Sequence, residues 1–574
     1  MMNLRFASAA LLLATLPAAA LLAAQTPPDY SVIIRGGTIF DGSGDQPIMG
    51  DVAIKDDKIV YVGPNAPGTA KEIVDASGKA VSPGFINMLS WAVESLIEDG
   101  RGVGDLVQGV TLEVFGEGNS MGPLNAAMKK NGRARQDDIK YPITWTSLGD
   151  YLEFLQKKGV SPNVASFIGA TTVRIHELGE KDIDPTPEQL ERMKGLVRTA
   201  MKDGAVGVGS SMIYAPANYA ETPELIAITA EAGKCGGMYI SHMRSEADRL
   251  NEAIDELIKI SRESGAAAEI YHFKQAGEAN WKKYDSAVAQ VEKARADGLK
   301  ITADMYTYTA GATGLDAAMP LWVQSGGLEQ WIANLKKPDV RARVLAEMRG
   351  PAVGWESLLQ LAGDPSRVLF LGFKNPKLKP LTGKTLAEVA KMRGTSVEDT
   401  AIDLVIEDGS RVGTAYFLMN EDNVRKATAL PWMSFGSDAE AAVPEGVFLK
   451  SSTHPRAYGN VARLLGKYVR EEKSTTLADA IHRLTWLPAT NLKIKGRGVL
   501  RPGYYADVVV FDPVTIQDHA TFEKPAQLAT GVESVFVNGT RVVKDGKHTG
   551  AKPGRVVRGP GWTGWADGGA CKES

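Results

Sequence analysis

Two histidines, His242 and His272, lie 30 residues apart, and each ends a short apolar run that follows a glycine. The runs read Gly-Gly-Met-Tyr-Ile-Ser-His242 and Gly-Ala-Ala-Ala-Glu-Ile-Tyr-His272. This spacing is typical of one strand-plus-helix unit, so both imidazoles are expected at the carboxyl ends of neighbouring parallel strands, where a (β/α)8 barrel gathers its catalytic groups. Imidazoles placed in this way hold a divalent metal and leave one position open for water. The pair therefore predicts a metal-dependent hydrolase.

Two carboxylates are predicted at the same end of the barrel. Glu117 follows the strand-like run Thr111-Leu-Glu-Val-Phe115 and would be a third ligand beside the histidines, a set that recurs in catalytic zinc sites. Asp438 follows the apolar run Trp432-Met-Ser-Phe-Gly436 and is the candidate general base, which takes a proton from metal-activated water and passes it to the leaving amine. Asp438 or Ser437 would also serve as a helix N-cap, and the two roles are compatible.

Three further side chains are candidates for substrate binding. Lys274 and Arg456 carry positive charges that suit an anionic substrate group, and a guanidinium can bind a carboxylate through two parallel hydrogen bonds. Each of the two is equally well explained as a surface charge. Tyr306, in Asp304-Met-Tyr306, has a phenolic hydroxyl for one hydrogen bond, although a tyrosine in the barrel wall would have the same sequence context.

The elements that would position these residues repeat along the middle of the chain. The predicted strands end at Ser210, His242, His272 and Asp304, at intervals of 32, 30 and 32 residues. A helix is predicted over 187–202, entered through Thr186 and closed by a glycine. Alternating strands and helices at this period predict a parallel sheet. An open, doubly wound sheet shares the pattern, but polar groups at so many strand ends favour the barrel.

The two ends of the chain are rich in short strands separated by Gly and Asp turns, whereas the middle is helical. The predicted fold class is α/β: a (β/α)8 TIM-like barrel over 83–494, plus a small β-sandwich domain built from 25–82 and 495–558. Helix-like stretches at about 315–412 break the barrel rhythm and are predicted to form an insertion that covers the site. The Gly- and Trp-rich tail, 559–574, is expected to be loosely ordered.

Composition narrows the function classes. The chain has 574 residues, 44% of them hydrophobic and 23% charged, which is typical of a globular protein. Its net charge of −3 gives no electrostatic case for nucleic acid as a partner.

Residues 1–24 have the pattern of a secretory signal peptide, so we expect a periplasmic or secreted protein that leaves the membrane after cleavage; the alternative is an uncleaved anchor. The two cysteines, Cys235 and Cys571, are expected to be unpaired thiols, because a protein with a core of this size needs no disulfide to stabilise it.

The chain resembles the N-acyl-D-amino-acid deacylases, or D-aminoacylases, of the amidohydrolase superfamily. The resemblance covers nearly the whole chain after the signal segment, in order. The matching segments are Arg35-Gly-Gly-Thr-Ile-Phe-Asp-Gly42, Pro83-Gly-Phe-Ile86, Ser241-His-Met-Arg-Ser-Glu246, Asp304-Met-Tyr306, Ser437-Asp438, His454-Pro-Arg456, Arg463-Leu-Leu-Gly-Lys-Tyr-Val-Arg470, Gly503-Tyr-Tyr-Ala-Asp-Val-Val-Val-Phe-Asp-Pro513 and Val537-Asn-Gly539 through Gly554-Arg555.

The resemblance implies an amidohydrolase whose substrate is a small N-acylated amino acid of D configuration. It implies a zinc ion held by His242 and His272, with Asp438 as the base. It also implies that Lys274, Tyr306 and Arg456 lie near the substrate carboxylate.

Two departures from the family pattern bear on the metal. The superfamily has a His-x-His pair shortly after the Pro-Gly-Phe-Ile turn, whereas this chain has Leu89 and Trp91, which cannot bind zinc. Glu117 stands where the family often has cysteine. We therefore expect one Zn²⁺ ion rather than two. The alternatives are an amidohydrolase for dipeptides with a D-residue or for another amide, cyclic amide or lactone, and a barrel that binds a ligand without catalysis.

Overall fold

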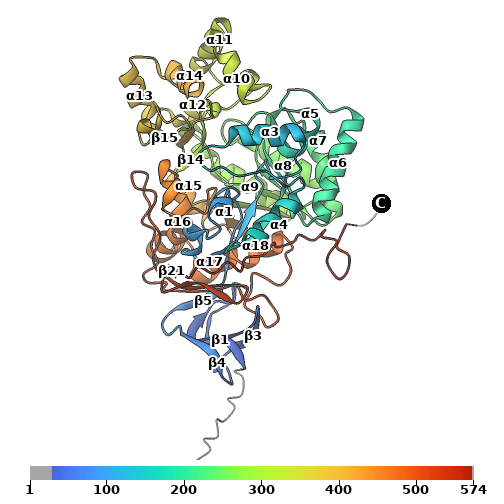
Figure 1. The fold of residues 1–574 in the computed structure, drawn as a ribbon, viewed down its shortest axis with the longest axis vertical. Coiled ribbons are helices and arrows are strands. Elements are labelled where there is room, and N and C mark those ends of the chain that lie inside the picture. The colour runs from blue at the N-terminus through green and yellow to red at the C-terminus, as the bar shows by residue number, and fades with distance from the viewer. Residues whose placement is uncertain (1–28, 572–574) are drawn as a thin grey trace, which may run out of the picture.

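The computed structural model describes residues 29–571, so the predicted signal segment, 1–24, lies outside the described residues. Strands from both ends of the chain form one nine-stranded sheet at the bottom of Figure 1. Its order is β21-β20-β19-β18-β5-β1-β2-β3, with β4 paired to β1. The strands are β1 Tyr30–Ile39, β2 Ile48–Lys55, β3 Lys58–Gly63, β4 Ala70–Asp75, β5 Ala80–Pro83, β18 Val508–Phe511, β19 Val532–Val537, β20 Thr540–Lys544 and β21 Lys547–His548.

The antiparallel pairing of β18 with β5 joins the two ends of the chain. The prediction that both termini contribute to one β-rich unit is therefore seen in the pairing. Its definition as a separate sandwich domain, with the boundaries 25–82 and 495–558, stays a prediction.

The middle of the chain contains a ring of parallel strands. The pairings run β6-β7-β8 and then β9-β10-β11-β12-β13-β17, and β8 and β9 lie on one run of chain. Met88 N donates to Phe435 O at 3.1 Å and Ser90 bridges Ala439 in parallel, which closes the ring between β6 and β17. The strands are β6 Phe85–Asn87, β7 Val110–Phe115, β8 Asn163–Ser166, β9 Ile168–Gly169, β10 Gly207–Ser211, β11 Met238–His242, β12 Ala268–Ile270, β13 Ile301–Met305 and β17 Met433–Phe435.

Helices follow the barrel strands in sequence and pack outside them (Figure 1). The predicted helix 187–202 is α6, and Thr186 caps it through Gln189 N in a reciprocal capping box. The helices of the barrel are α1 Ser95–Glu98, α2 Val103–Leu106, α3 Ala126–Arg135, α4 Leu148–Lys158, α5 Ala170–Leu178, α6 Pro187–Lys202, α7 Thr222–Lys234, α8 Leu250–Ser264, α9 Tyr284–Ala296, α15 Glu421–Ala427, α16 Arg456–Arg463, α17 Leu477–Leu484 and α18 Trp486–Asn491.

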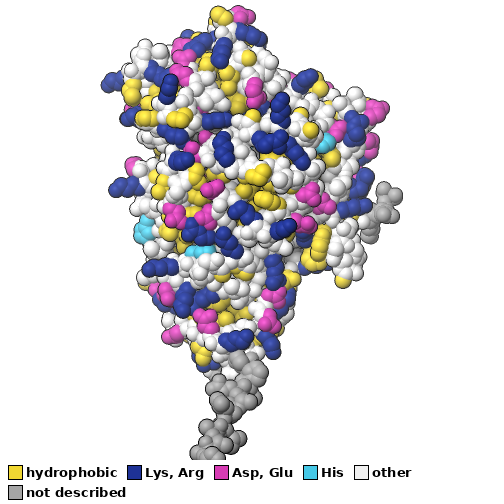
Figure 2. All heavy atoms as spheres, in the orientation of Figure 1, with side chains coloured by type: hydrophobic (Ala, Val, Ile, Leu, Met, Phe, Trp, Pro, Cys, Tyr) yellow, Lys and Arg dark blue, Asp and Glu magenta, His cyan; other side chains and the backbone are white. Residues whose placement is uncertain are grey.

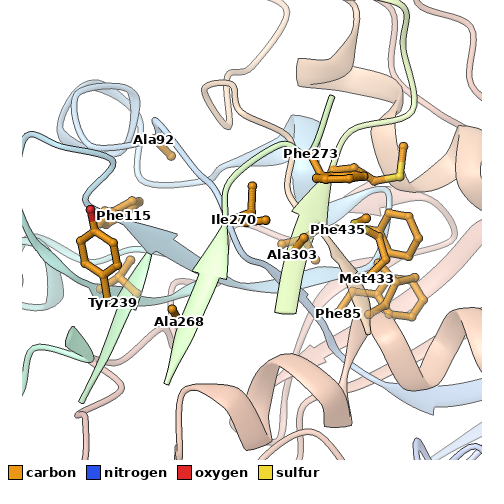
Figure 3. Packing of buried hydrophobic residues seen from close by; sticks show 14 of the residues in the cluster. Phe85, Ala92, Phe115, Tyr239, Ala268, Ile270, Phe273, Ala303, Met433 and Phe435 are labelled. Carbon is orange, nitrogen blue, oxygen red and sulfur yellow. The ribbon is translucent and has the colours of Figure 1, made fainter. Parts of the chain in front are cut away.

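Side chains alternate between the two faces of each barrel strand. In β11, Tyr239 belongs to the large cluster between strands and helices, whereas Met238 and Ile240 belong to a second cluster shared with Leu112 and Val114 of β7. Figure 3 shows the first cluster, with side chains of β12, β13 and β17 packed together. Because the period of a strand is two, His242 shares the inner face with Met238 and Ile240. The hydrophobic pattern therefore turns this imidazole towards the barrel mouth.

The insertion between β13 and β17 has its own hydrophobic core and lies at the top left of Figure 1. Its three strands pair in the antiparallel order β14-β16-β15. The elements are β14 Ala310–Gly314, α10 Leu328–Leu335, α11 Pro338–Arg349, α12 Leu358–Ala362, β15 Val368–Gly372, α13 Leu386–Arg393, α14 Val397–Asp408 and β16 Gly413–Phe417.

The tail corrects two expectations. Cys235 and Cys571 form a disulfide across a sequence separation of 336 residues, so the prediction of two unpaired thiols was wrong. The described part of the tail, 559–571, is tied to the barrel rather than loose. Gly559 N donates to Gly204 O at 2.8 Å and Thr563 N to Lys202 O at 3.1 Å. These contacts bring Cys571 to the end of α7, a proximity that no local sequence pattern reveals.

Among residues 29–571, no helix combines the length and apolar character needed to cross a bilayer. Acidic and basic side chains are intermixed on the face shown in Figure 2, in keeping with the near-zero net charge.

Candidate metal centre and active site

Glu117, His242 and His272 converge at the carboxyl ends of three barrel strands. Glu117 lies two residues beyond β7, His242 ends β11, and His272 lies two residues beyond β12. Glu117 Oε1 is 3.0 Å from His242 Nδ1 and 3.0 Å from His272 Nε2. All three side chains are buried, and their candidate ligand atoms lie within 4.8 Å of one another.

This donor set fits a zinc ion. Two imidazoles and a carboxylate are typical zinc ligands, with metal–ligand distances of about 2.0–2.2 Å. Ligand atoms about 3 Å apart are compatible with a common ion at such distances. Burial alone raises the pKa of Glu117, but the two imidazoles outweigh it and hold that pKa well below its usual range. The site therefore presents a negative charge between two nitrogen donors.

A second layer, formed by Glu246 and Lys274, fixes His272. Glu246 Oε1 lies 3.0 Å from His272 Nδ1 and 2.5 Å from Lys274 Nζ. Burial and Lys274 lower the pKa of His272, but Glu246 and Glu117 outweigh them and raise it to about 10. For His242 the largest influence is burial, and its pKa is lowered. Lys274 therefore lines the site, but its ammonium is already paired with a carboxylate, and its role in substrate binding stays a prediction.

Asp438 faces this centre from the end of β17. Its Oδ2 is 2.7 Å from Arg456 Nη2, and its Oδ1 accepts a hydrogen bond from Trp91 Nε1 at 3.0 Å. Burial raises the pKa of Asp438 and Arg456 lowers it, with a net rise. A carboxylate with a raised pKa that faces a metal site is suited to accept and return a proton.

Within residues 29–571, Arg456 and Tyr306 have side-chain hydrogen-bond donors without a partner. Among the described residues, Arg456 Nε and Nη1 and the Tyr306 hydroxyl are buried without a partner. The guanidinium lies 4.3 Å from the centre of the Tyr306 ring. Buried polar groups without partners are costly, so these atoms are suited to a ligand that accepts hydrogen bonds.

His454 holds the start of the Arg456 helix. Its Nε2 lies 3.0 Å from Ala310 O and its Nδ1 accepts from Arg456 N at 3.0 Å. Burial lowers the pKa of His454 well below its usual value, which keeps the ring neutral and compatible with one donated and one accepted hydrogen bond.

Two residues of the site have strained backbones. His272 has a φ of +37° and Asp438 a φ of +49°, both in the left-handed region that side chains other than glycine rarely adopt. Each such residue costs about 1–3 kcal/mol and persists only where its surroundings enforce it. The strain therefore marks positions where the direction of the side chain matters more than local stability.

The centre opens into a cavity of about 710 Å³. Barrel loops supply the candidate metal and substrate residues, and the insertion supplies another wall, which includes Leu328, Trp331, Leu358 and Arg411. The insertion thus lies beside the site, and the expectation that it covers the site stays a prediction. A cavity of this size accommodates a small molecule.

The structure thus brings together every residue that the sequence singled out: Glu117, His242, His272, Lys274, Tyr306, Asp438 and Arg456. Sequence reasoning missed three others. Glu246, four residues after His242, and His454, two before Arg456, lay inside quoted motifs without a role, so their spacing was the available signal. Trp91 was recognised only as a residue that cannot bind zinc, whereas its indole N–H contacts two carboxylates.

Comparison with known proteins defines the family. Residues 139–543 match the amidohydrolase family. D-aminoacylase of Alcaligenes xylosoxydans xylosoxydans is 32% identical over 531 residues, which cover 92% of this chain and 97% of that protein. The chain belongs to the amidohydrolase family, and within it to the D-aminoacylases. N-acyl-D-aspartate deacylase of the same organism is 29% identical to this amidohydrolase over 93% of the chain and 96% of that protein.

Solved structures agree with this assignment. A crystal structure of D-aminoacylase has a TM-score of 0.76 at 30% identity and covers 92% of this amidohydrolase and all of that chain. N-acyl-D-glutamate deacylase from Bordetella bronchiseptica, solved with zinc and a phosphonate that mimics the tetrahedral intermediate, has a TM-score of 0.75 at 28% identity, with 92% and 99% covered. Dihydropyrimidinase of Brevibacillus agri, at 16% identity and a TM-score of 0.52, shares the fold alone.

Proposed function

We propose that this amidohydrolase hydrolyses N-acyl-D-amino acids to a D-amino acid and a carboxylic acid. The observation that carries the proposal is the presence, in one cavity, of a candidate metal centre and of free donors on Arg456 and Tyr306. An N-acyl amino acid needs both, because its amide must meet the hydrolytic groups while its carboxylate needs a cationic partner. The relatives named as D-aminoacylase and as deacylases of N-acyl-D-aspartate and N-acyl-D-glutamate support the substrate class.

The cofactor proposed is a single Zn²⁺ ion held by Glu117, His242 and His272. When bound, zinc supplies Lewis acidity towards the amide carbonyl and towards water. Zinc is favoured by the two-imidazole, one-carboxylate donor set. Glu246 and Lys274 contact Nδ1 of His272 and orient its ring, as outer partners of metal-binding histidines commonly do.

Asp438 is the proposed general base. It takes a proton from the attacking water and delivers it to the amide nitrogen as the carbon–nitrogen bond breaks, so it ends the cycle as a carboxylate again. Its salt bridge to Arg456 and its hydrogen bond from Trp91 fix both of its oxygens. Arg456 Nε and Nη1 and the Tyr306 hydroxyl would bind the substrate carboxylate. Binding there places the amide beside the base rather than at the cavity mouth.

Two wider features belong to the proposal. We infer that the mature protein is periplasmic or secreted, and the disulfide between Cys235 and Cys571 supports this because disulfides form and persist in oxidising compartments. We also infer that the terminal strands act as a β-sandwich domain that supports the barrel. The core shared by strands of both chain ends is compatible with that role.

The test is amine release from paired N-acetyl-D- and N-acetyl-L-amino acids, with purified mature protein and one equivalent of zinc. Turnover confined to the D series is the expected result. Asp438→Asn should lower kcat by roughly 10²- to 10⁴-fold, the usual contribution of a general base, and should keep the zinc.

Turnover of the L series at equal rates would contradict the stereochemical part of the proposal. Failure on both series, with zinc bound, would favour a dipeptide with a D-residue, another amide, a cyclic amide or a lactone. Full activity in Asp438→Asn would show that Asp438 is not the general base.

A further inference from the structure

Trp91 lies between the two carboxylates of the site. Its indole Nε1 donates to Glu117 Oε2 at 3.1 Å and to Asp438 Oδ1 at 3.0 Å. These residues follow β6, β7 and β17, which are neighbours around the barrel. One N–H group therefore connects a candidate metal ligand to the candidate base across three strands.

A group between these two carboxylates can reduce the repulsion between their charges. The carboxylates of Glu117 and Asp438 repel each other because both are anions held against the same N–H group. A cation would offset the repulsion, and so would a shared hydrogen-bond donor. An indole N–H is a donor without acceptor capacity, so it can stabilise both carboxylates but cannot bind a metal.

The indole ring of Trp91 also fills space in the site. Trp91 lines the cavity and packs against the inner cluster of the barrel. Leu89, the other residue at the position of the superfamily's histidine pair, is buried in that cluster and contributes its carbonyl to Asp438 N at 2.8 Å. Neither side chain offers a ligand atom.

A solved D-aminoacylase provides the contrast. It is described as having a binuclear metal centre, with activation by one metal and attenuation by a second, and it is 31% identical to this chain with a TM-score of 0.76. In this chain the two positions of the superfamily's His-x-His pattern hold Leu89 and Trp91, and the Trp91 indole is hydrogen-bonded to both carboxylates.

We propose that Trp91 takes the place of a second metal ion: its indole N–H holds Glu117 and Asp438 in position, restricts the site to one metal, and removes attenuation by excess metal. Trp91 is thus a positioning residue for Asp438. The kinetic part rests on the proposed function, whereas the restriction to one metal does not.

The first measurement is zinc content. Wild-type protein is equilibrated with a range of free zinc concentrations and analysed for zinc per chain. We expect a plateau at one ion. The double variant Leu89→His/Trp91→His, which restores the histidine pair, should bind a second ion. Trp91→Phe, the matched control, should stay at one because the ring still fills the space. A plateau of two in wild type would overturn the proposal.

The second measurement separates positioning from bulk. Trp91→Phe removes the N–H and keeps the ring, so kcat should fall by roughly 10- to 100-fold at unchanged zinc content, with a smaller change in KM. Wild-type activity should not decline at excess zinc, whereas that of the double variant should. Unchanged kcat in Trp91→Phe would overturn the positioning role.

The two measurements also separate this proposal from the proposed function. A wild-type protein that is inactive on every N-acyl-D-amino acid but still stops at one zinc would refute the substrate class and leave the metal restriction standing. Should the double variant fail to fold, the wild-type plateau and Trp91→Phe still decide the matter.

Discussion

Glu117 supplies the negative charge of the candidate ligand set. It faces two imidazoles with one oxygen and the Trp91 indole with the other. A buried carboxylate is costly unless such partners compensate it, and a bound cation compensates it further. The choice of glutamate where the family often has cysteine keeps an anionic ligand and adds an oxygen that reaches Trp91. A thiolate has a single ligand atom, so a metal and Trp91 would have to share it.

Replacing Glu117 by Gln should weaken zinc binding by more than the roughly 10- to 100-fold that loss of an outer partner costs, because a charged ligand becomes a neutral amide. Zinc affinity is measured by competition with a chelator of known affinity. Glu117→Cys is the matched control and should retain zinc, since a thiolate is itself a good ligand. Equal zinc affinity in Glu117→Gln and wild type would remove Glu117 from the ligand set.

Sequence reasoning located these residues but not their connections. Glu117, His242 and Asp438 could be found because each follows an apolar run, and parallel strands bring such ends together. The hydrogen bonds of Trp91 could not be found in this way. They join residues 26 and 347 positions apart and depend on the direction of the ring in the loop after β6.

At the scale of elements, the 30-residue period predicted the parallel strands and their helices, because each unit buries one apolar face in a regular way. The insertion lacks such a period, so its three-stranded sheet was not predicted. Its attachment to the barrel depends in part on Glu356, which accepts hydrogen bonds from Ser245 Oγ, Glu246 N and Ala247 N. The insertion is thereby fixed to the loop that carries Glu246.

The pKa of Glu356 predicts a pH effect. Burial raises this pKa, hydrogen bonds from Ser245 and Glu246 N lower it, and the net value is about 7. In the unfolded chain it is about 4.3. Because the folded value is the higher one, this group's contribution to stability falls as pH rises from about 4.3 to about 7. Glu356→Gln does not titrate, so the melting temperature of wild type minus that of the variant should decrease over this range.

The melting temperatures are measured by calorimetry at half-unit steps of pH. Glu407→Gln, at a half-exposed carboxylate of α14 paired with Arg393, is the control and should not reproduce the trend. A constant difference between wild type and Glu356→Gln from pH 4.5 to 7 would show that Glu356 titrates alike in the folded and unfolded chain.

At the scale of the whole molecule, the chain is held together by contacts between segments that are far apart in sequence. Strand β18 pairs with β5, and the disulfide joins Cys571 of the tail to Cys235 at the end of α7. The β-rich ends could be recognised from alternating apolar residues and turns. The disulfide could not, because a lone pair of cysteines 336 residues apart carries no pattern, and only the path of the tail over α6 and α7 brings them together.

Cys571→Ser should lower stability without impairing chemistry. A disulfide stabilises mainly by restricting the unfolded chain, typically by about 2–4 kcal/mol, so the melting temperature should fall by a few degrees. Neither cysteine lines the cavity, and kcat/KM at 25 °C should stay at the wild-type value. The double variant Cys235→Ser/Cys571→Ser is the control for a free thiol and should match the single variant in both measurements.

Because the disulfide forms in an oxidising compartment, the stability of the protein should depend on the compartment in which the chain folds. Protein recovered from the periplasm should have no thiol that reacts with a disulfide reagent after unfolding, whereas protein made without its first 24 residues in a reducing cytosol should have two and melt at the temperature of Cys571→Ser. Mild oxidation of the cytosolic protein should then restore the wild-type melting temperature, because the hydrogen bonds of Gly559 and Thr563 already hold the tail beside α6. Two reactive thiols in the periplasmic protein would mean that the bond does not form where export would place the chain.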